Sequence, residues 1–199
     1  MTLEQFKAIW VKAQAAINAN EKYFSELDAA TGGDGDHGTA IVAALNAIVN
    51  ADGDDFKSYI ENMAEKLETE ASGSTSSLYG GWCEGMAEAV PAGKTELTAD
   101  EVAAMFEGGF DEICALTKAR KGDKTMMDAL QPATEALLAA QGEGEAAMFA
   151  AAAKAAKEGS EATAQMQAKF GRARNLGERS IGAIDAGSAS MAVIFSCFA

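Results

Sequence analysis

The sequence predicts an all-α protein, built as a closed bundle of antiparallel helices in one domain over residues 1–199. Apolar residues recur at helical spacing through most of the chain, and the alternating β-branched runs that would indicate strands are absent. With 199 residues, 48% of them hydrophobic, the chain is large enough for one substantial core and short for two. Solenoid proteins repeat a sequence unit of about 20 to 50 residues, and this chain shows no such repeat. We therefore expect a closed bundle rather than a solenoid.

The first helix is predicted to begin near residue 3. Thr2 and Gln5 have the spacing of a capping box, in which the two side chains satisfy free amides of the first turn. Apolar residues at positions 3, 6, 10, 13 and 17 mark the buried face of this helix. The stretch "NEKYFSELDAA" is also predicted to be helical, and a further helix is expected to begin near Gly38.

Helical periodicity continues through the middle and the C-terminal half of the chain. One apolar stripe runs through positions 56, 60, 63 and 67, and another runs from 102 to 113 behind the capping box of Thr98 and Glu101, which predicts a helix start near residue 99. Pro132 is expected either to open a helix at its first turn or to bend one running from about 125 to about 141. Segment 143–170 is dense in Ala, Lys and Glu, which are strong helix formers.

Four stretches rich in Gly, Ser and Asp interrupt the helical pattern, at residues 28–39, 71–81, 120–125 and 171–188. Loops that join helices running up and down can meet at one end of a bundle. We therefore expect ligand chemistry at that end.

The charge and the cysteines exclude several classes of protein. A net charge of −14 argues against binding nucleic acid or an anionic membrane, because both need a positive field. Cys83, Cys114 and Cys197 are odd in number and widely spaced, which indicates packed thiols in a reducing compartment rather than a disulfide framework or a metal site. The sequence shows neither a signal peptide nor a membrane span, so we expect a cytoplasmic protein.

The loop "TGGDGDHGTA" (residues 31–40) matches the dinucleotide-binding fingerprint G-x-G-x-x-G through Gly33, Gly35 and Gly38. That fingerprint needs a strand before its first glycine, whereas a helix is predicted here. Asp34 and Asp36 would also repel a phosphate, at a cost of several kcal/mol if poorly solvated. The literal match is therefore misleading.

Carboxylates and phosphates can share a site when a divalent metal lies between them. Asp34 and Asp36, with Asp28 at the end of the preceding helix, form a cluster suited to the hard, oxygen-preferring Mg²⁺ ion. A calcium EF-hand loop starting at Asp34 would need a bidentate Glu at its last position, where Leu45 stands, and is set aside. The simpler alternative is that these Asp side chains only cap the helix that begins near Gly38.

Other residues near these loops could serve a nucleotide site. His37, the single histidine, could contact a phosphate or be phosphorylated itself, and a hydrogen-bonded structural role is the alternative. "ASGSTSSLYGG" offers hydroxyls and free amides at a predicted helix start, an arrangement that binds anions, although such loops are also ordinary linkers. "KGDKTMMDAL" places a Lys and a Thr at a loop-to-helix junction, where Met126 could pack on a base or in the core. No Walker lysine motif occurs.

Together these loops resemble the nucleotide-binding L subunit of dihydroxyacetone kinase, a DAK2 domain family. The matching stretches are "LDAATGGDGDHGTA", "SGSTSSLYGG", "GDKTMMDAL" and "GRARNLGERSIGAIDAG". They occur in the family's order and span nearly the whole chain. The resemblance implies a barrel of eight antiparallel helices with ADP or ATP bound at one end together with Mg²⁺, for which two ions are expected.

The resemblance also assigns roles by position. It implies that Asp28, Asp34 and Asp36 are both the Mg²⁺ ligands and the catalytic group. The implied nucleotide contacts comprise a phosphate-contacting helix start, a hydroxyl pair, a base contact, an arginine and a closing turn, namely His37, Gly38, Thr39, Ser74, Thr75, Met126, Arg172, Asp185, Ala186 and Gly187.

This chain departs from the family pattern at three places. Ala40 stands where the family usually has Asn, serines at 72, 74 and 76 replace a glycine-richer loop, and "AIDAG" replaces an "HPDPG"-like turn. A missing proline loosens a turn, and serines restrict a loop that glycine would leave free. We expect these departures to affect nucleotide affinity and the choice of sugar, not the metal cluster.

In this family, an L subunit encoded alone keeps ADP as a bound phosphoryl carrier. A phosphotransferase-system protein recharges it, and the resulting ATP phosphorylates dihydroxyacetone or a related small sugar held covalently on a separate K subunit. The resemblance therefore implies a kinase subunit that needs a K-type partner. Alternatives are a kinase subunit that exchanges ATP freely, a non-enzymatic nucleotide sensor that binds a transcriptional regulator, and a phosphocarrier that uses His37.

Overall fold

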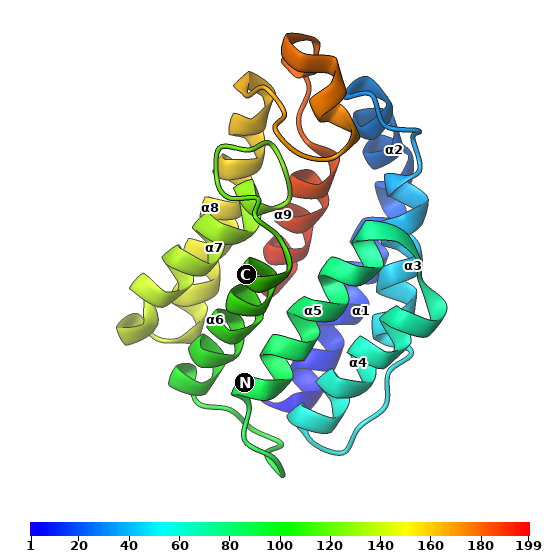
Figure 1. The fold of residues 1–199 in the computed structure, drawn as a ribbon. Coiled ribbons are helices and arrows are strands. Elements are labelled where there is room, and N and C mark those ends of the chain that lie inside the picture. The colour runs from blue at the N-terminus through cyan, green and yellow to red at the C-terminus, as the bar shows by residue number, and fades with distance from the viewer.

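The computed structural model describes residues 1–199 and consists of helices and connecting loops (Figure 1). The α-helices are α1 (Leu3–Ala19), α2 (Glu21–Ala30), α3 (His37–Val49), α4 (Phe56–Glu70), α5 (Gly73–Ala89), α6 (Ala99–Leu116), α7 (Met127–Ala139), α8 (Glu145–Ala162) and α9 (Ala186–Phe198). Three 3₁₀ helices complete the list: η1 (Gln141–Glu143), η2 (Thr163–Gln165) and η3 (Arg172–Ser180). The only strand-like pairing is an isolated bridge between Thr2 and Glu96, as an all-α fold requires.

Eight of the α-helices form a closed ring. In ring order, α1 packs on α3, each following helix packs on the next as far as α9, and α9 packs back on α1. The remaining helix, α2, continues from α1 after a break at Asn20 and covers α3 and α9 at one end of the ring (Figure 1). The predicted closed barrel of about eight antiparallel helices is confirmed, with α2 as an additional helix.

The two capping boxes set helix starts where they are predicted. At α1, the Gln5 amide donates to the Thr2 hydroxyl at 3.2 Å, and the Thr2 amide donates to the Gln5 side chain at 2.8 Å. At α6, Thr98 and Glu101 make the same reciprocal pair, at 3.3 Å and 2.9 Å. Each box satisfies amides that have no partner within the helix.

Of the two expectations for Pro132, the structure shows the second: the proline lies inside α7 and not at its first turn. The end of the following helix differs from expectation. Segment 143–170 is helical in α8 only as far as Ala162. The helix stops there because Thr163 is used in tertiary contacts: its hydroxyl accepts from the Asp185 amide at 2.9 Å, and its carbonyl accepts from Lys124 Nζ at 2.7 Å. Such distant partners leave no trace in helical periodicity.

Aromatic side chains fill the core of the ring. Trp10 and Trp82 meet edge to face with ring centroids 6.0 Å apart, and Phe106 packs on Trp82 at the same distance. Small residues let neighbouring helices approach: a Cβ atom on Gly85 of α5 would lie 2.3 Å from the carbonyl oxygen of Gly108 in α6. The helix ring is therefore close-packed, and it holds the loops at its ends in fixed positions.

The predicted loop 171–188 is partly structured. It contains η3, whose helical path is broken at Gly177 (φ 57°, ψ −131°), and it leads into α9 at Ala186. We call residues 166–184 the cap, because they cross the α2 end of the bundle, where they form the orange segment at the top of Figure 1.

The cysteines occur as free thiols. Cys83 and Cys197 are buried and Cys114 is partly buried, as packed thiols should be. No helix of the structure is both long enough and apolar enough to cross a membrane.

Candidate functional site

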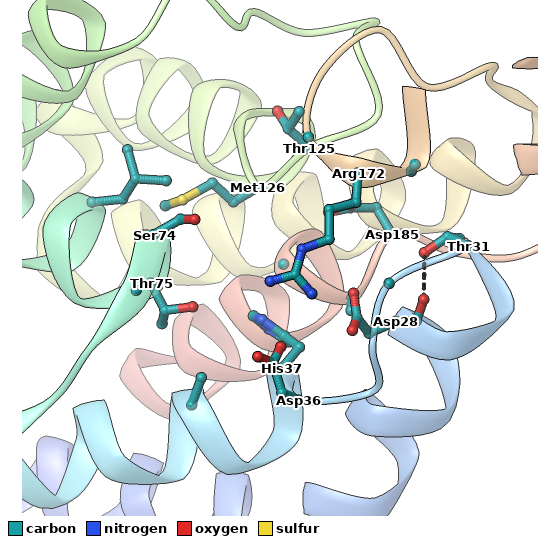
Figure 2. Close-up of a pocket in the computed structure, with 18 of the residues that line it drawn as sticks. Asp28, Thr31, Asp36, His37, Ser74, Thr75, Thr125, Met126, Arg172 and Asp185 are labelled. Carbon is teal, nitrogen blue, oxygen red and sulfur yellow. Dashed lines mark hydrogen bonds between the residues drawn. The ribbon is translucent and has the colours of Figure 1, made fainter. Parts of the chain in front are cut away.

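A cavity of about 310 Å³ opens beneath the cap, and all four predicted loop stretches contribute to its wall. Its principal polar lining residues come from different elements, as Figure 2 shows. They include Asp28, Thr31, Asp34, Asp36, His37, Ser74, Thr75, Lys124, Thr125, Arg172 and Asp185. Apolar side chains of Leu78, Met126 and Phe170 complete the wall.

Three carboxylates converge on one side of the cavity. One oxygen each from Asp28, Asp34 and Asp36 can be chosen so that all three lie within 4.8 Å of one another. The loop geometry depends on glycine: a Cβ atom on Gly33 would lie only 2.1 Å from Asp28 Oδ1, and Gly35 has a φ of +77°. Because oxygen donors at this spacing suit a hard divalent cation, the cluster fits Mg²⁺.

The capping alternative is not supported by the hydrogen bonds. Asp36 occupies the N-cap position of α3, but its side chain makes no capping bond. Asp28 Oδ2 instead accepts the Gly35 amide at 2.8 Å, which folds the loop back on the end of α2. The carboxylates therefore gather around a common point rather than each satisfying a helix terminus.

Arg172 of the cap forms an ion pair with Asp34. A hydrogen bond from this guanidinium lowers the pKa of the Asp34 carboxyl, whereas burial and the neighbouring Asp34 raise the pKa of Asp36. Crowded carboxylates favour proton or cation binding, because like charges at short range repel one another. A cation bound between these carboxylates would therefore be stabilised by their negative charges.

The start of α3 lies beside the acidic cluster. His37 Nε2 lies 2.9 Å from Ser190 Oγ in α9, and burial lowers the pKa of the imidazole, so the ring is neutral at pH 7. Gly38 and Thr39 do not line the cavity. A Cβ atom on Gly38 would lie 2.0 Å from the Glu21 carbonyl oxygen, and Thr39 Oγ1 donates to the Glu21 carboxylate at 3.2 Å. In this structure both residues bring α3 against α2.

The first turn of α5 supplies hydroxyls to the opposite wall. Ser74 and Thr75 line the cavity, and Figure 2 shows both across from His37. The N-terminal amides of a helix attract anions. One turn further on, Tyr79 is 2% exposed and also lines the cavity, and its hydroxyl has no hydrogen-bond partner.

The remaining wall is formed by the loop before α7 and by the start of α9. Met126 lies at this junction and packs close to Gly187, where an added Cβ atom would lie 3.4 Å from Met126 Cβ. Asp185 caps α9 by accepting the Ser188 amide at 2.7 Å. Burial raises the pKa of Asp185 to about 7. Ala186, in the first turn of α9, lines the cavity as well.

Sequence reasoning noted the Lys before Thr125 but did not predict that Lys124 is buried and joins two loops. This residue is 2% exposed, has a φ of +59°, and donates its ammonium to the carbonyls of Thr163 and Ala183. It thereby joins the loop before α7 to the cap, while Asp128 holds the same loop by accepting the amides of Gly122 (2.6 Å) and Thr125 (2.8 Å). A lysine between Asp and Thr in a glycine-containing loop is the only sequence signal, and it does not reveal burial.

Comparison with known proteins identifies relatives along most of the chain. The family model described as the DAK2 domain matches residues 32–199. The chain is 35% identical to the D-erythrulose kinase of Mycolicibacterium smegmatis over 196 residues, covering 94% of this chain and 33% of that protein. It is 33% identical to the PEP-dependent dihydroxyacetone kinase, ADP-binding subunit DhaL, of Escherichia coli, covering 88% of this chain and 85% of that subunit.

Solved structures share the fold. The dihydroxyacetone kinase from C. freundii in complex with AMP-PNP and Mg²⁺ matches with a TM-score of 0.73 at 23% identity, over 96% of this chain and 32% of that one. The chain thus spans about a third of the length of the D-erythrulose kinase and of dihydroxyacetone kinase 1 from Saccharomyces cerevisiae, 33% and 30% respectively.

Proposed function

Because this chain belongs to the DAK2 domain family, we propose that it is the nucleotide-binding subunit of a dihydroxyacetone-type kinase. In this proposal the whole chain, residues 1–199, acts as one nucleotide-binding unit. It binds ADP or ATP with Mg²⁺, two ions being expected, and provides the phosphoryl group for dihydroxyacetone or a related small sugar. The likeness to an ADP-binding subunit of which the chain covers 85% supports a subunit role.

The observation that carries the proposal is the convergence of three carboxylates in a cavity that also holds hydroxyls and an arginine. Acidic and phosphate-binding groups coexist when a divalent cation links them. Asp28, Asp34 and Asp36 would hold the ion. When bound, Mg²⁺ supplies charge neutralisation for the phosphates of the nucleotide.

The other groups of the chain position the nucleotide. His37, Ser74 and Thr75 present neutral donors around the cavity, and the first turns of α3 and α5 provide free amides. Met126 would pack on the base and Arg172 would contact a phosphate. Asp185, Ala186 and Gly187, at the start of α9, would form the closing turn of the nucleotide site. Gly38 and Thr39 would act through the placement of α3. No protein nucleophile is needed, since phosphoryl transfer depends mainly on positioning and electrostatics.

Native mass spectrometry of the protein as purified, with and without a chelator, tests this proposal. We expect a bound nucleoside diphosphate that is lost when the metal is removed. Asp36→Asn should abolish Mg²⁺-dependent binding of ADP, whereas Asp54→Asn, an exposed carboxylate outside this cavity, should leave it unchanged. Absence of nucleotide, together with no Mg²⁺-dependent thermal shift by ADP, would refute the proposal.

In this proposal a separate K-type subunit would hold the sugar, as the family resemblance implies. A phosphotransferase-system phosphocarrier would recharge the bound ADP in the cytoplasm, and a transcriptional regulator would be a further partner. Reconstitution with a K-type subunit, with and without the phosphocarrier, tests these partners. Turnover that requires the phosphocarrier supports the carrier role.

A second candidate is a kinase subunit that exchanges ATP freely. It is favoured by the closing turn at residues 183–187, where "AIDAG" lacks the prolines of the family pattern, because a looser turn would hold the nucleotide less firmly. Gel filtration after loading with ADP and Mg²⁺ distinguishes the two: retained ADP supports the carrier, and complete loss supports exchange.

A further inference from the structure

The cap is attached unequally on its two sides. Toward the loop before α7, Lys169 Nζ contacts Asp123 at 2.8 Å and the Gly122 carbonyl at 2.9 Å. Toward η2, the Gly182 amide donates to the Ala164 carbonyl at 2.8 Å. These bonds anchor one edge of the cap firmly to the bundle.

Across the cavity, the opposite edge of the cap has few contacts with the acidic loop. The ion pair between Arg172 and Asp34 is the only polar bond between η3 and residues 28–36. Leu176 adds one apolar contact, since a Cβ atom on Gly32 would lie 2.6 Å from its Cδ1. Figure 2 shows the guanidinium of Arg172 directed from the cap toward the side of the cavity that holds Asp28 and Asp36. Contact along this edge therefore depends on one charge pair and one apolar side chain.

The partner of Arg172 is one of the three carboxylates that would hold the metal. The Asp34 side chain is 53% exposed and that of Arg172 is 62% exposed, so the pair is well solvated. Such exposed pairs are weak, and a divalent cation with two charges competes effectively for the same carboxylate.

We propose that Arg172 is a resident cation of the acidic cluster, which competes with a divalent metal ion for Asp34. Its guanidinium neutralises Asp34 and holds the cap over the cluster. A divalent cation competes with it for Asp34, and the released guanidinium becomes available to an anionic phosphate. This inference rests on the proposed function and extends it, because it defines how a divalent metal ion replaces the Arg172 guanidinium at Asp34.

The proposal predicts that one variant, Arg172→Gln, binds the metal more tightly and the nucleotide more weakly. Arg172→Gln removes the competing cation, so binding of Mn²⁺ alone should become about two- to fivefold tighter, the range expected for loss of an exposed ion pair. The same variant should bind ADP with saturating Mg²⁺ about tenfold or more weakly, because a charge-assisted bond to phosphate is lost. Arg172→Lys keeps the charge and should bind Mn²⁺ with nearly wild-type affinity.

Electron paramagnetic resonance of Mn²⁺ titrated into the nucleotide-free protein measures the first effect. The matched control is Arg174→Gln, which removes an exposed arginine of the same segment that has no ion-pair partner, and it should leave Mn²⁺ affinity unchanged within error. Limited trypsin digestion gives a second measurement, because loss of the ion pair should speed cleavage after Arg179 in Arg172→Gln but not in Arg174→Gln.

Unchanged or weaker Mn²⁺ binding by Arg172→Gln would overturn the proposal, and so would equal tightening in the Arg174→Gln control. If the wild-type protein binds ADP with Mg²⁺ while either of these results is found, only the resident-cation role fails. If the wild-type protein binds neither Mn²⁺ nor ADP, the proposed function fails and the resident-cation role fails with it.

Discussion

The tightest geometric constraint on the acidic cluster is at Gly33, and replacing this residue by Ala should separate metal binding from stability. An alanine Cβ atom would lie 2.1 Å from Asp28 Oδ1 and 2.3 Å from Oδ2, where ordinary contact begins at 3.4 Å. Asp28 must therefore move by more than about 1 Å, whereas metal-ligand distances tolerate about 0.2 Å. We expect affinity for ADP in the presence of Mg²⁺ to fall at least about tenfold, since even outer-shell changes cost about 10- to 100-fold.

Stability should change little in the same variant. Moving Asp28 weakens its bond to the Gly35 amide, which contributes about 0.5–1.5 kcal/mol. Alanine offsets this by restricting the unfolded chain, a gain of about 0.4–1 kcal/mol. The net effect is below about 1 kcal/mol, or less than about 4 °C in Tm for a chain of this size.

Calorimetric titration with ADP, at zero and at saturating Mg²⁺, combined with thermal melting, measures both quantities. Gly80→Ala is the control, because a Cβ atom there meets no heavy atom within 4 Å. It should melt at or above the wild-type temperature and bind ADP normally. Wild-type Mg²⁺-dependent affinity in Gly33→Ala would refute the assignment of Asp28 to the metal cluster.

Three further substitutions test other parts of the site. Lys124→Met leaves the Ala183 carbonyl without a donor, while the Thr163 carbonyl keeps its bond from the Met166 amide. The variant should lower the free energy of unfolding by about 1–3 kcal/mol in urea titrations, and an unchanged midpoint would contradict the role of Lys124 in joining the loops. Asp185→Asn keeps a side-chain acceptor for the Ser188 amide but cannot ionise. Burial raises the pKa of Asp185 to about 7, so the folded protein holds this proton more tightly than the unfolded chain does. The wild-type protein without nucleotide should therefore lose stability as pH rises from about 4 to about 7, whereas the Tm of Asp185→Asn should depend less on pH. Identical dependence of Tm on pH in the two proteins would exclude the burial effect. Gly38→Ala places a Cβ atom 2.0 Å from the Glu21 carbonyl oxygen and should cost about 1–3 kcal/mol in thermal melts, and full stability would show that α3 can shift at no cost.

Local signals explain which parts of the fold could be predicted. The capping boxes at Thr2 and Thr98 act within a single turn, so their spacing in the sequence was sufficient. The end of α8 depends instead on bonds from Lys124 to the Thr163 carbonyl, which join residues far apart in the chain. The helical pattern and the lack of repeats predict a closed bundle, but the order in which eight helices pack around the ring depends on contacts between residues far apart in the chain, and the eight-helix barrel could be expected only from the family resemblance.

The same distinction holds for the candidate site. Asp28 lies in the last turn of α2, and Asp34 and Asp36 follow within the short loop that leads to α3. Glycines in this loop allow the three carboxylates to converge. The pairing of Asp34 with Arg172 could not be predicted, because it depends on where the cap crosses the bundle. Sequence patterns therefore predicted the chemistry of the cluster but not the cation that occupies it in the ligand-free protein.

The charge distribution leads to a final prediction, because the net charge of the chain and the charges beside the cavity have opposite effects on an anionic nucleotide. The net charge of −14 should repel ADP, but eight of the 16 basic residues fall within residues 118–124 and 169–179, which flank the cavity. At about 0.1 M salt the Debye length is about 10 Å, whereas a helix as long as α1 separates the ends of the bundle by about 25 Å. Distant carboxylates are then largely screened, while the basic segments still act on the ligand. Raising salt from about 0.1 M to about 1 M at saturating Mg²⁺ should therefore weaken ADP binding. Tighter binding at high salt would mean that the overall negative charge, and not the basic rim, governs the approach of the nucleotide.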